Sequence, residues 1–183
     1  MQTKDLCLAT LQLGEASGYD IKTLFENAFR HFQRVSYGSI YPALNDLAKA
    51  GMVECRVDTP ANGPEKKLYS LTTLGEERFF ETINNTPPSD SYQSDFLVLI
   101  LFSRWIRRDR LATIMDDYRD NLEHEALELK RLLANKENCL STEARFTINF
   151  GLSALGAKIR FLEENADDLL LHHQEQTKLE NQP

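Results

Sequence analysis

The sequence predicts a mainly α-helical protein with a two-stranded wing, in which an N-terminal winged helix-turn-helix is followed by a C-terminal three-helix domain. Three observations predict this fold. Residues 36–51 have the pattern of a helix with one apolar face, two short strand patterns follow at 52–57 and 66–71, and most of the second half has helical periodicity. A helix followed at once by a hairpin is the element order of a winged helix-turn-helix, so DNA binding is the leading hypothesis.

Two helices are expected before residue 36, where they complete a three-helix core. The first covers residues 3–13 and ends near Gly14, a residue type that commonly follows a helix C-terminus. The second begins after Ser17, with Asp20 placed three residues on to form a capping box. Its apolar spacing predicts four buried residues: Ile21, Leu24, Phe25 and Ala28.

The helix at 36–51 has an inner and an outer face. At about 100° per residue, Ile40, Leu44 and Leu47 fall within roughly 60° of one another and form the buried stripe. Asn45 and Lys49 lie on the opposite side and face outward. Because a recognition helix presents polar side chains to DNA, both residues are candidate contacts.

The start of this helix carries hydroxyl groups where the helix dipole favours an anion. Ser36 or Ser39 serves as the N-cap, and Pro42 is expected early because it lacks the N–H that the interior of a helix needs. Gly51 ends the helix as a C′ glycine. The alternative role of tyrosines in this segment is to cover the edge of the core. The candidate DNA contacts that the segment adds are Ser36, Tyr37, Ser39 and Tyr41.

Two strands joined by a turn-rich loop form the predicted wing. The strands are residues 52–57 and 66–71, and the loop at 58–65 contains two prolines, a glycine and an asparagine. Lys66 and Lys67 are candidate phosphate contacts, although Glu65 beside them partly offsets their charge. The alternative is that this lysine pair is ordinary solvated surface.

An ordered series of motifs runs through the first 80 residues. Its members are Gly18-Tyr-Asp-Ile21, Phe32, Arg34, Gly38-Ser-Ile-Tyr-Pro42, Leu44, Leu47, Gly51-Met-Val53, Gly63-Pro64, Lys67, Tyr69, Leu71-Thr72 and Gly75. The series resembles the PadR family of bacterial transcriptional regulators, and the Gly-Ser-Ile-Tyr-Pro run is a specific signal of that family.

The resemblance implies a winged-helix DNA-binding domain followed by a helical dimerisation domain. It also implies a repressor of nearby genes that a small molecule or a stress signal releases. The contacts it implies are Ser36, Ser39 and Tyr41 on the recognition helix and Lys66 and Lys67 on the wing. Gln33 stands where the family often has tryptophan, and Val35 and Tyr37 stand where prolines are frequent. The approach to the recognition helix, and the base preference, are therefore expected to differ.

A fourth helix and a polar boundary follow the wing. Thr72 or Thr73 caps the helix, Glu76 is placed to close a capping box on Thr73, and the helix runs to about Ile83. Residues 84–90 contain paired prolines among polar residues, which is typical of a linker between domains. The predicted divisions are a DNA-binding domain at 1–85, a helical dimerisation domain at 92–175 and a polar tail at 176–183.

Three helices are expected in the second half, at 95–105, 110–136 and 142–171, with a break at 138–141. The last carries an a/d stripe over three heptads, and the helix before it repeats the pattern less regularly. The two stripes can pack on each other within one chain or form a seam between two chains. A homodimer is favoured, because it gives a winged helix two half-sites on a palindromic operator. The candidate dimerisation residues are Ile148, Leu152, Leu155, Ile159 and Leu162.

The junction between the first two of these helices carries four arginines at 104–110. A second anion-binding site is one interpretation. The favoured one is a solvated junction in which Asp109 caps the next helix and Asp116 and Asp117 balance the charge. Core packing is likewise favoured over an aromatic effector pocket for three residues of this region, Phe96, Phe102 and Trp105.

The net charge is the observation that fits DNA binding least. The 183 residues carry a formal charge of −7, and residues 1–85 hold 9 Lys and Arg against 11 Asp and Glu. A DNA-binding domain is expected to present a basic face. Binding therefore requires that positive side chains gather on one side and that two copies act together. The side chains available for this are Arg34, Lys49, Lys66 and Lys67.

The sequence contains no motif typical of a metal site, a cofactor site, an enzyme or a membrane protein. Three widely spaced cysteines and four histidines form no zinc or disulfide spacing, so we expect no metal, no cofactor and a reducing cytoplasm. The sequence has no glycine-rich phosphate loop and no Gly-x-Ser-x-Gly motif, so an enzyme is not expected. The first residues are polar, so we expect no signal peptide, and the longest apolar run, at 96–102, falls far short of the roughly 20 residues that cross a bilayer.

The rival hypothesis is a protein-interaction adaptor that does not bind DNA sequence-specifically. Winged helices can also bind proteins, and an acidic, helix-rich chain fits such a role. An adaptor would be expected to present an apolar patch on the outer face of its third helix, whereas this face carries serine, tyrosine, asparagine and lysine.

Overall fold

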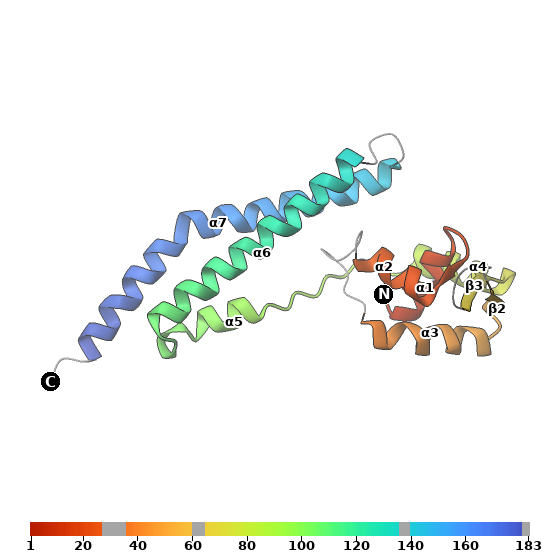
Figure 1. The fold of residues 1–183 in the computed structure, drawn as a ribbon, viewed down its shortest axis with the longest axis horizontal. Helices are drawn as coiled ribbons and strands as arrows, with labels where there is room; N and C mark the ends of the chain where they lie inside the picture. Colours follow the sequence, from red (N-terminus) through yellow and green to blue (C-terminus); the bar gives the residue numbers. More distant parts are fainter. Residues whose placement is uncertain (27–35, 60–64, 136–139, 181–183) are drawn as a thin grey trace. The chain divides into compact units, whose positions relative to one another are not determined.

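The computed structural model describes residues 1–26, 36–59, 65–135 and 140–180, the last of these beyond His172 by backbone alone. The chain divides into two compact units, Met1–Asp90 and Ser91–Pro183, which are considered separately (Figure 1). Several residues singled out in the sequence lie outside the described ranges: Ala28, Phe32, Gln33, Arg34, Val35, Gly63, Pro64, Lys136 and residues 138 and 139 of the predicted break.

The N-terminal unit is a winged helix-turn-helix, and the predicted fold class is confirmed. In chain order its elements are α1 (Thr3–Leu11), β1 (Ala16–Ser17), α2 (Gly18–Leu24), α3 (Tyr37–Lys49), β2 (Val53–Asp58), β3 (Lys66–Leu71) and α4 (Thr73–Asn85). The first helix ends two residues earlier than predicted, with Gln12 as its C-cap. Gly14 then turns the chain with a φ of 137°, a value that favours glycine.

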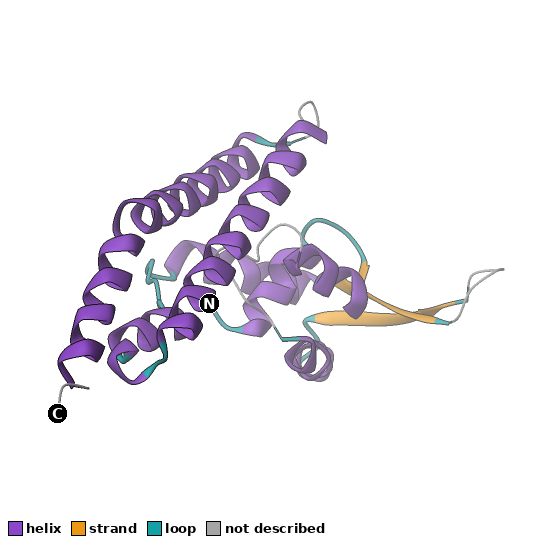
Figure 2. Cartoon of the chain, turned by 60° about the vertical axis from the view of Figure 1, so that its left-hand side comes forward, coloured by secondary structure: helices purple, strands orange, loops and turns teal. Residues whose placement is uncertain are grey.

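The sheet has three antiparallel strands in the order β1-β3-β2, one more than predicted (Figure 2). β2 and β3 form the predicted hairpin of the wing. β1 pairs Ala16 with Tyr69 and Ser17 with Leu68. A strand of two residues is too short to leave a periodic pattern in a sequence, which is why it was missed.

One apolar core holds the helices against the sheet. Ile21, Ile40 and Leu44 have no exposed surface, and Leu47 is 3% exposed. The predicted buried stripe of α3 is thus confirmed, and so is burial of Ile21 and Phe25; Leu24 is only half-buried. With its apolar stripe packed inward, α3 presents its polar face to solvent.

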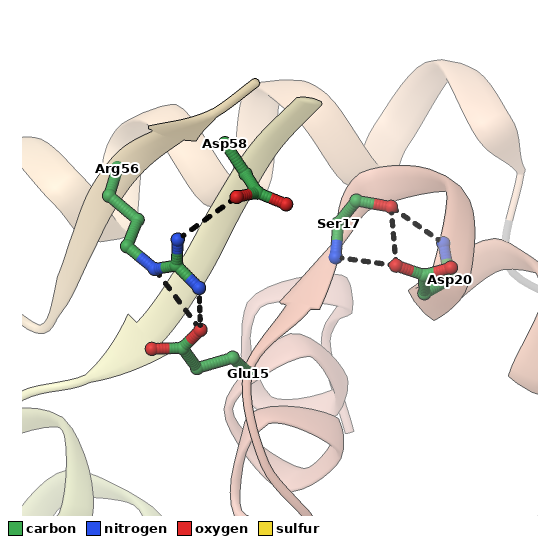
Figure 3. Close-up of polar contacts among 5 residues, drawn as sticks. All are labelled: Glu15, Ser17, Asp20, Arg56 and Asp58. Carbon is green, nitrogen blue, oxygen red and sulfur yellow. Dashed lines mark hydrogen bonds and ion pairs between the residues drawn. The ribbon is translucent and has the colours of Figure 1, made fainter. Parts of the chain in front are cut away.

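The predicted capping box at the start of α2 is present (Figure 3). Ser17 Oγ accepts a hydrogen bond from the Asp20 N–H at 3.1 Å, and the Ser17 N–H donates to Asp20 Oδ2 at 3.0 Å. The Ser17 hydroxyl also donates to Asp20 Oδ2 at 2.7 Å. Because these bonds favour the ionised carboxylate, the pKa of Asp20 lies below its usual value.

The recognition helix α3 ends at the predicted C′ glycine. Gly51 has a φ of 70°, and its N–H donates to the Ala48 carbonyl at 3.0 Å. The Met52 N–H donates to the Leu47 carbonyl at 2.9 Å. This pair of bonds is a Schellman motif, which satisfies the last carbonyl groups of the helix.

The fourth helix begins directly beside this motif. Its N-cap is Thr72, whose Oγ1 accepts from the Gly75 N–H at 3.2 Å and donates to the Gly51 carbonyl at 2.7 Å. The alternative, a capping box between Thr73 and Glu76, is not formed, because Thr73 is already the first helical residue. Thr72 therefore links the end of α3 to the start of α4.

In its described parts, the C-terminal unit contains helices and no strands. Its elements are α5 (Asp95–Leu101), the short 3-10 helix η2 (Ser103–Trp105), α6 (Arg108–Asn135) and α7 (Thr142–Glu180). The helix predicted at 95–105 therefore breaks at Phe102, and α7 continues into the segment predicted as a polar tail. Within the described ranges, no helix combines the length and the apolar character needed to cross a membrane.

The a/d stripe of α7 packs against α6 within the chain, which is one of the two arrangements that the sequence left open. α6 and α7 run alongside each other (Figure 1). Ile148, Leu155 and Leu162 are 4–6% exposed and join a core with residues of α6, among them Leu122 and Leu129. The other two assigned residues, Leu152 and Ile159, are half-buried against the same core. The apolar stripes of α6 and α7 thus pack on each other in the single chain.

The junction at 104–110 is the solvated region that the sequence favoured, with two corrections. α6 begins at Arg108, so Asp109 lies in its first turn and is not its cap. Asp109 pairs with Arg107, which lowers the pKa of Asp109. The expected core packing of the aromatic residues is wrong for Trp105 and Phe102, which are 71% and 51% exposed.

Candidate nucleic-acid interface

Four side-chain positions of α3 form its outer stripe: Gly38, Pro42, Asn45 and Lys49. They follow one another at steps of four, three and four residues, which places them within about 60° of one another on a helix. All four are exposed, and they lie opposite the buried stripe of the helix. Two of them, Asn45 and Lys49, are predicted contacts that can offer an amide and an ammonium group to DNA.

The hydroxyl groups at the start of α3 bond to each other. The Ser36 hydroxyl donates to Ser39 Oγ at 3.1 Å, and the Ser39 hydroxyl donates to the Ser36 carbonyl at 2.8 Å. Ser36 is the N-cap, but its side chain accepts no bond from the helix N–H groups. Among the described side chains, none caps the first N–H groups of α3, where the positive end of the helix dipole favours an anion.

The structure describes the side chain of only one of the two tyrosines at the start of α3. Tyr41 is half-buried, and its ring lies so close to Gly18 that a Cβ built on that glycine would be 2.8 Å from the ring. The alternative role as a core-edge residue therefore applies to Tyr41, which holds α3 against the first turn of α2. Tyr37 is described by its backbone alone, as the first residue of α3.

Pro42 was expected early in α3. It is the sixth residue of the helix, in the second turn. Because proline has no N–H, it cannot donate to the carbonyl of Gly38 four residues earlier. The carbonyl group of Gly38, in the first turn of α3 on the side of the outer stripe, therefore lacks this helical hydrogen bond.

One acidic residue lies on α3 beside the outer stripe. Asp46 Oδ2 is 2.9 Å from the Lys4 Nζ of α1. The hydrogen bond and the charge of Lys4, with a smaller effect of Lys49, lower the pKa of Asp46. Lys4 thus offsets the negative charge that α3 would otherwise present next to Lys49.

The two lysines of the wing face different surroundings. In the sheet register Lys66 pairs with Asp58, and its charge contributes to the lowered pKa of Asp20. Lys67 pairs with Val57, an apolar residue that is 58% exposed. Because cross-strand partners share a face, the charge of Lys66 lies among carboxylates, whereas Lys67 has an apolar neighbour. Lys67 is consequently the better candidate for a phosphate contact.

A third cation of the wing, Arg56, was not singled out in the sequence. Its Nη2 lies 2.7 Å from Glu15 Oε2, and its Nη1 lies 3.5 Å from Asp58 Oδ1 (Figure 3). The pKa of Glu15 is lowered by this hydrogen bond and charge. Arg56 and Asp58 are two residues apart on β2, so their side chains lie on the same face of the strand. The contact between Arg56 and Glu15 joins residues 41 positions apart, and no sequence pattern indicates it.

Three aromatic residues for which the sequence favoured core packing over an effector pocket, Phe96, Phe102 and Trp105, each take part in a ring contact. Phe96 stacks on Tyr118 with ring centroids 3.8 Å apart, whereas Phe102 and Trp105 contact each other at 5.9 Å. Among the residues that the structure describes, no group of three histidine, cysteine, aspartate or glutamate side chains is placed to hold a metal ion.

Comparison with known proteins points to a single family. Residues 7–81 match the transcriptional regulator PadR-like family. The negative transcriptional regulator PadR of Bacillus subtilis (strain 168) is 26% identical over 136 residues, which cover 74% of this chain and 73% of the relative. The match includes α3, the wing and most of α4.

Solved structures extend the similarity to nearly the whole chain. The PadR-like transcriptional regulator BC1756 from Bacillus cereus is 26% identical with a TM-score of 0.80, covering 92% of this chain and 98% of that one. Bacillus subtilis PadR in complex with operator DNA has the same fold, with 21% identity, a TM-score of 0.75 and coverage of 91% and 98%. The complex of that protein with p-coumaric acid is 20% identical, with a TM-score of 0.67 and coverage of 91% and 97%.

Proposed function

Because this chain belongs to the PadR-like family of transcriptional regulators, we propose that it is a cytoplasmic repressor that binds a palindromic operator as a homodimer. As a member of this family it is a transcriptional regulator and not an enzyme. The observation that carries the proposal is the outer stripe of α3, whose exposed Asn45 and Lys49 lie opposite the buried stripe of the helix. The proposed contacts are Ser36, Tyr37, Ser39, Tyr41, Asn45 and Lys49 on α3 with Lys66 and Lys67 on the wing.

The net charge of the N-terminal unit supports the proposal that two copies of the chain bind DNA together. Residues 1–85 contain two more carboxylates than cationic side chains, and Lys4, Lys66 and Arg56 lie next to carboxylates of the same unit. Few cations therefore remain for DNA phosphates in one copy. A dimer doubles these contacts and imposes its two-fold symmetry on the operator. We expect weak binding to random DNA and a strong salt dependence of operator binding.

A second stripe of α7 supports the homodimer. Phe146, Phe150 and Phe161 are 73%, 67% and 63% exposed. At about 100° per residue they lie within roughly 60° of one another, on the side of α7 opposite the buried a/d stripe. Exposed apolar patches of this kind mark interaction surfaces. We therefore move the proposed dimer surface from the a/d stripe to these three phenylalanines, the aromatic stripe of α7.

A small-molecule or stress signal is proposed to release the operator. Support comes from Bacillus subtilis PadR, which has been solved with operator DNA and with p-coumaric acid. Those structures share the fold of this chain.

Variants of the proposed contacts test DNA binding. Genomic fragments bound by the full chain would be selected to give the operator, and affinity would then be measured by fluorescence anisotropy over a range of salt concentrations. Lys49→Ala and Lys67→Ala should each bind more weakly. Each should also lower the slope of log K against log salt by about two, since one phosphate contact contributes about one and a dimer has two copies.

The matched control is Lys130→Ala, which removes an exposed lysine of α6. Its affinity and salt slope should equal those of the wild type. Tyr41→Ala and Tyr41→Phe separate the two roles of Tyr41, because the phenylalanine keeps the ring against Gly18 and removes only the hydroxyl. Unchanged affinity in Lys49→Ala, Lys67→Ala and Tyr41→Ala together would contradict the contact assignment and favour the adaptor hypothesis.

A further inference from the structure

The outer side of α7 carries a symmetric pattern of side chains in the middle of the aromatic stripe. Phe150, Ala154, Ala157 and Phe161 follow one another at steps of four, three and four residues, and all four are exposed. At about 100° per residue they lie within roughly 60° of one another. From either end of the helix, the order is therefore a phenylalanine, two alanines and a phenylalanine at the same spacings.

Such a pattern is complementary to itself across a two-fold axis. In a two-fold contact, residue i of one copy meets residue j of the other, and j meets i. Two antiparallel α7 helices with the axis midway between Ala154 and Ala157 would bring each Phe150 opposite Phe161 of the partner subunit. Each Ala154 would likewise lie opposite Ala157 of the partner subunit. Small side chains at the crossing let the two helices approach closely, while the rings close the contact at both ends.

The distribution of charge bounds the contact to this segment. The two charged residues between 150 and 161 are Lys158 and Arg160, which lie about 70° and 90° to either side of the centre of the pattern. Beyond the pattern, Glu164 and Asp168 return exposed carboxylates to the outer side of the helix. A centre without charge and a charged margin are typical of the interface between two proteins.

The exposed rings supply a substantial part of the area that a dimer needs. Phe150 and Phe161 are 67% and 63% exposed, while Leu155 and Leu162 on the opposite side of the helix are already buried in the core with α6. An aromatic side chain buries about 150–250 Å² in all, so two copies of each ring bring roughly 400–650 Å² to the contact. That is about a third of a standard interface.

We infer that two copies of this chain pair through antiparallel α7 helices, on a two-fold axis that passes between Ala154 and Ala157. The inference rests on the proposed homodimer and gives the register of its aromatic stripe.

Single cysteines report this register. In full-length protein with Cys55→Ser and Cys139→Ser, the one native cysteine left is Cys7, which has no exposed surface and whose thiol pKa is raised to about 11 by burial. Ala154→Cys or Ala157→Cys would then be added, and disulfide-linked dimers would be measured on a non-reducing gel after mild oxidation. Both variants should cross-link equally, because each position lies about 4.5 Å along the helix axis from its counterpart.

The matched control is Glu164→Cys, at an exposed position on the same side of α7. In the proposed register it lies about 25 Å along the axis from its counterpart and should not cross-link. Cross-linking of Glu164→Cys would indicate parallel helices, and cross-linking at 154 without cross-linking at 157 would move the axis. Either result, or no cross-link at 154 and 157 in a dimeric protein, would overturn the inference while the homodimer stands.

The size of residue 157 tests the close approach of the two helices. Leucine is nearly as good a helix former as alanine and adds apolar surface. At the crossing, however, Ala157→Leu should weaken the dimer about tenfold or more, because it separates the backbones. Ala134→Leu, at an exposed alanine of α6, should leave it unchanged. Sedimentation equilibrium measures both. An equal or tighter dimer in Ala157→Leu would overturn the inference, whereas a monomeric wild type would contradict the proposed homodimer itself.

Discussion

A Gly75→Ala variant is expected to lose much of the stability of the N-terminal unit. The added Cβ would lie 2.0 Å from the Met52 carbonyl oxygen and 3.0 Å from its carbon. Both are backbone atoms, so no side-chain rotation relieves the clash. Overpacking typically costs about 1–3 kcal/mol, and we expect the upper end or more here because the backbone itself must move.

The backbone cannot move at this point without breaking other bonds. The Met52 carbonyl accepts a hydrogen bond from the Thr72 N–H at 3.1 Å, and the neighbouring Gly51 carbonyl accepts the Thr72 hydroxyl. Gly51 also ends α3. A shift of this contact therefore changes the end of the recognition helix, and we expect weaker operator binding along with the lower stability.

Urea unfolding of the full chain, followed by circular dichroism, measures the effect. The midpoint of the transition of the N-terminal unit should fall in Gly75→Ala, whereas Gly156→Ala, which has room for a Cβ, should leave it in place. Equal midpoints in the two variants would mean that α4 and the Met52 carbonyl are not packed as the structure has them.

A Phe150→Asp variant is expected to be monomeric at the micromolar concentrations at which we expect the wild type to be a dimer. Phe150 lies at 67% exposure between Phe146 and Phe161 on the aromatic stripe of α7. Burying a phenylalanine contributes about 1.5–3 kcal/mol, and a two-fold interface contains the residue twice. Losing both copies and placing two carboxylates there should weaken the dimer by at least about 100-fold.

Sedimentation velocity measures this change. The control is Leu74→Asp, which places the same charge at an exposed apolar residue of α4, in the N-terminal unit. Leu74→Asp should remain a dimer. A dimeric Phe150→Asp would exclude the aromatic stripe as the seam, and a monomeric wild type would remove the basis for a palindromic operator.

The elements that the sequence predicted correctly are those with a local signal. Ile40, Leu44 and Leu47 repeat at the helical period, and their burial follows from that spacing. Ser17 and Asp20 stand at the spacing of a capping box, which needs no information from the rest of the chain. The wing hairpin likewise follows from two strand patterns and the turn residues between them.

The features that were missed depend on contacts between distant segments. β1 exists because residues 16 and 17 meet β3, and Glu15 meets Arg56 across 41 residues. The a/d stripe of α7 was found, but periodicity cannot tell whether its partner is α6 or a second chain. Phe146, Phe150 and Phe161 could be proposed as an interaction surface only from the structure, because it shows that α6 packs against the opposite side of α7.

The candidate DNA contacts were predictable to different degrees. The outward direction of Asn45 and Lys49 follows from helical geometry. The difference between Lys66 and Lys67 does not, because it depends on strand register and on Asp20 of another element.

We propose above all that two copies of this chain bind one operator through their α3 helices. Sedimentation velocity of the full-length protein with a labelled operator duplex tests it most directly. We predict a complex of two chains per duplex that forms on the selected operator, dissociates as salt is raised and is lost in Phe150→Asp. One chain per duplex, or equal binding to operator and scrambled DNA, would contradict the claim.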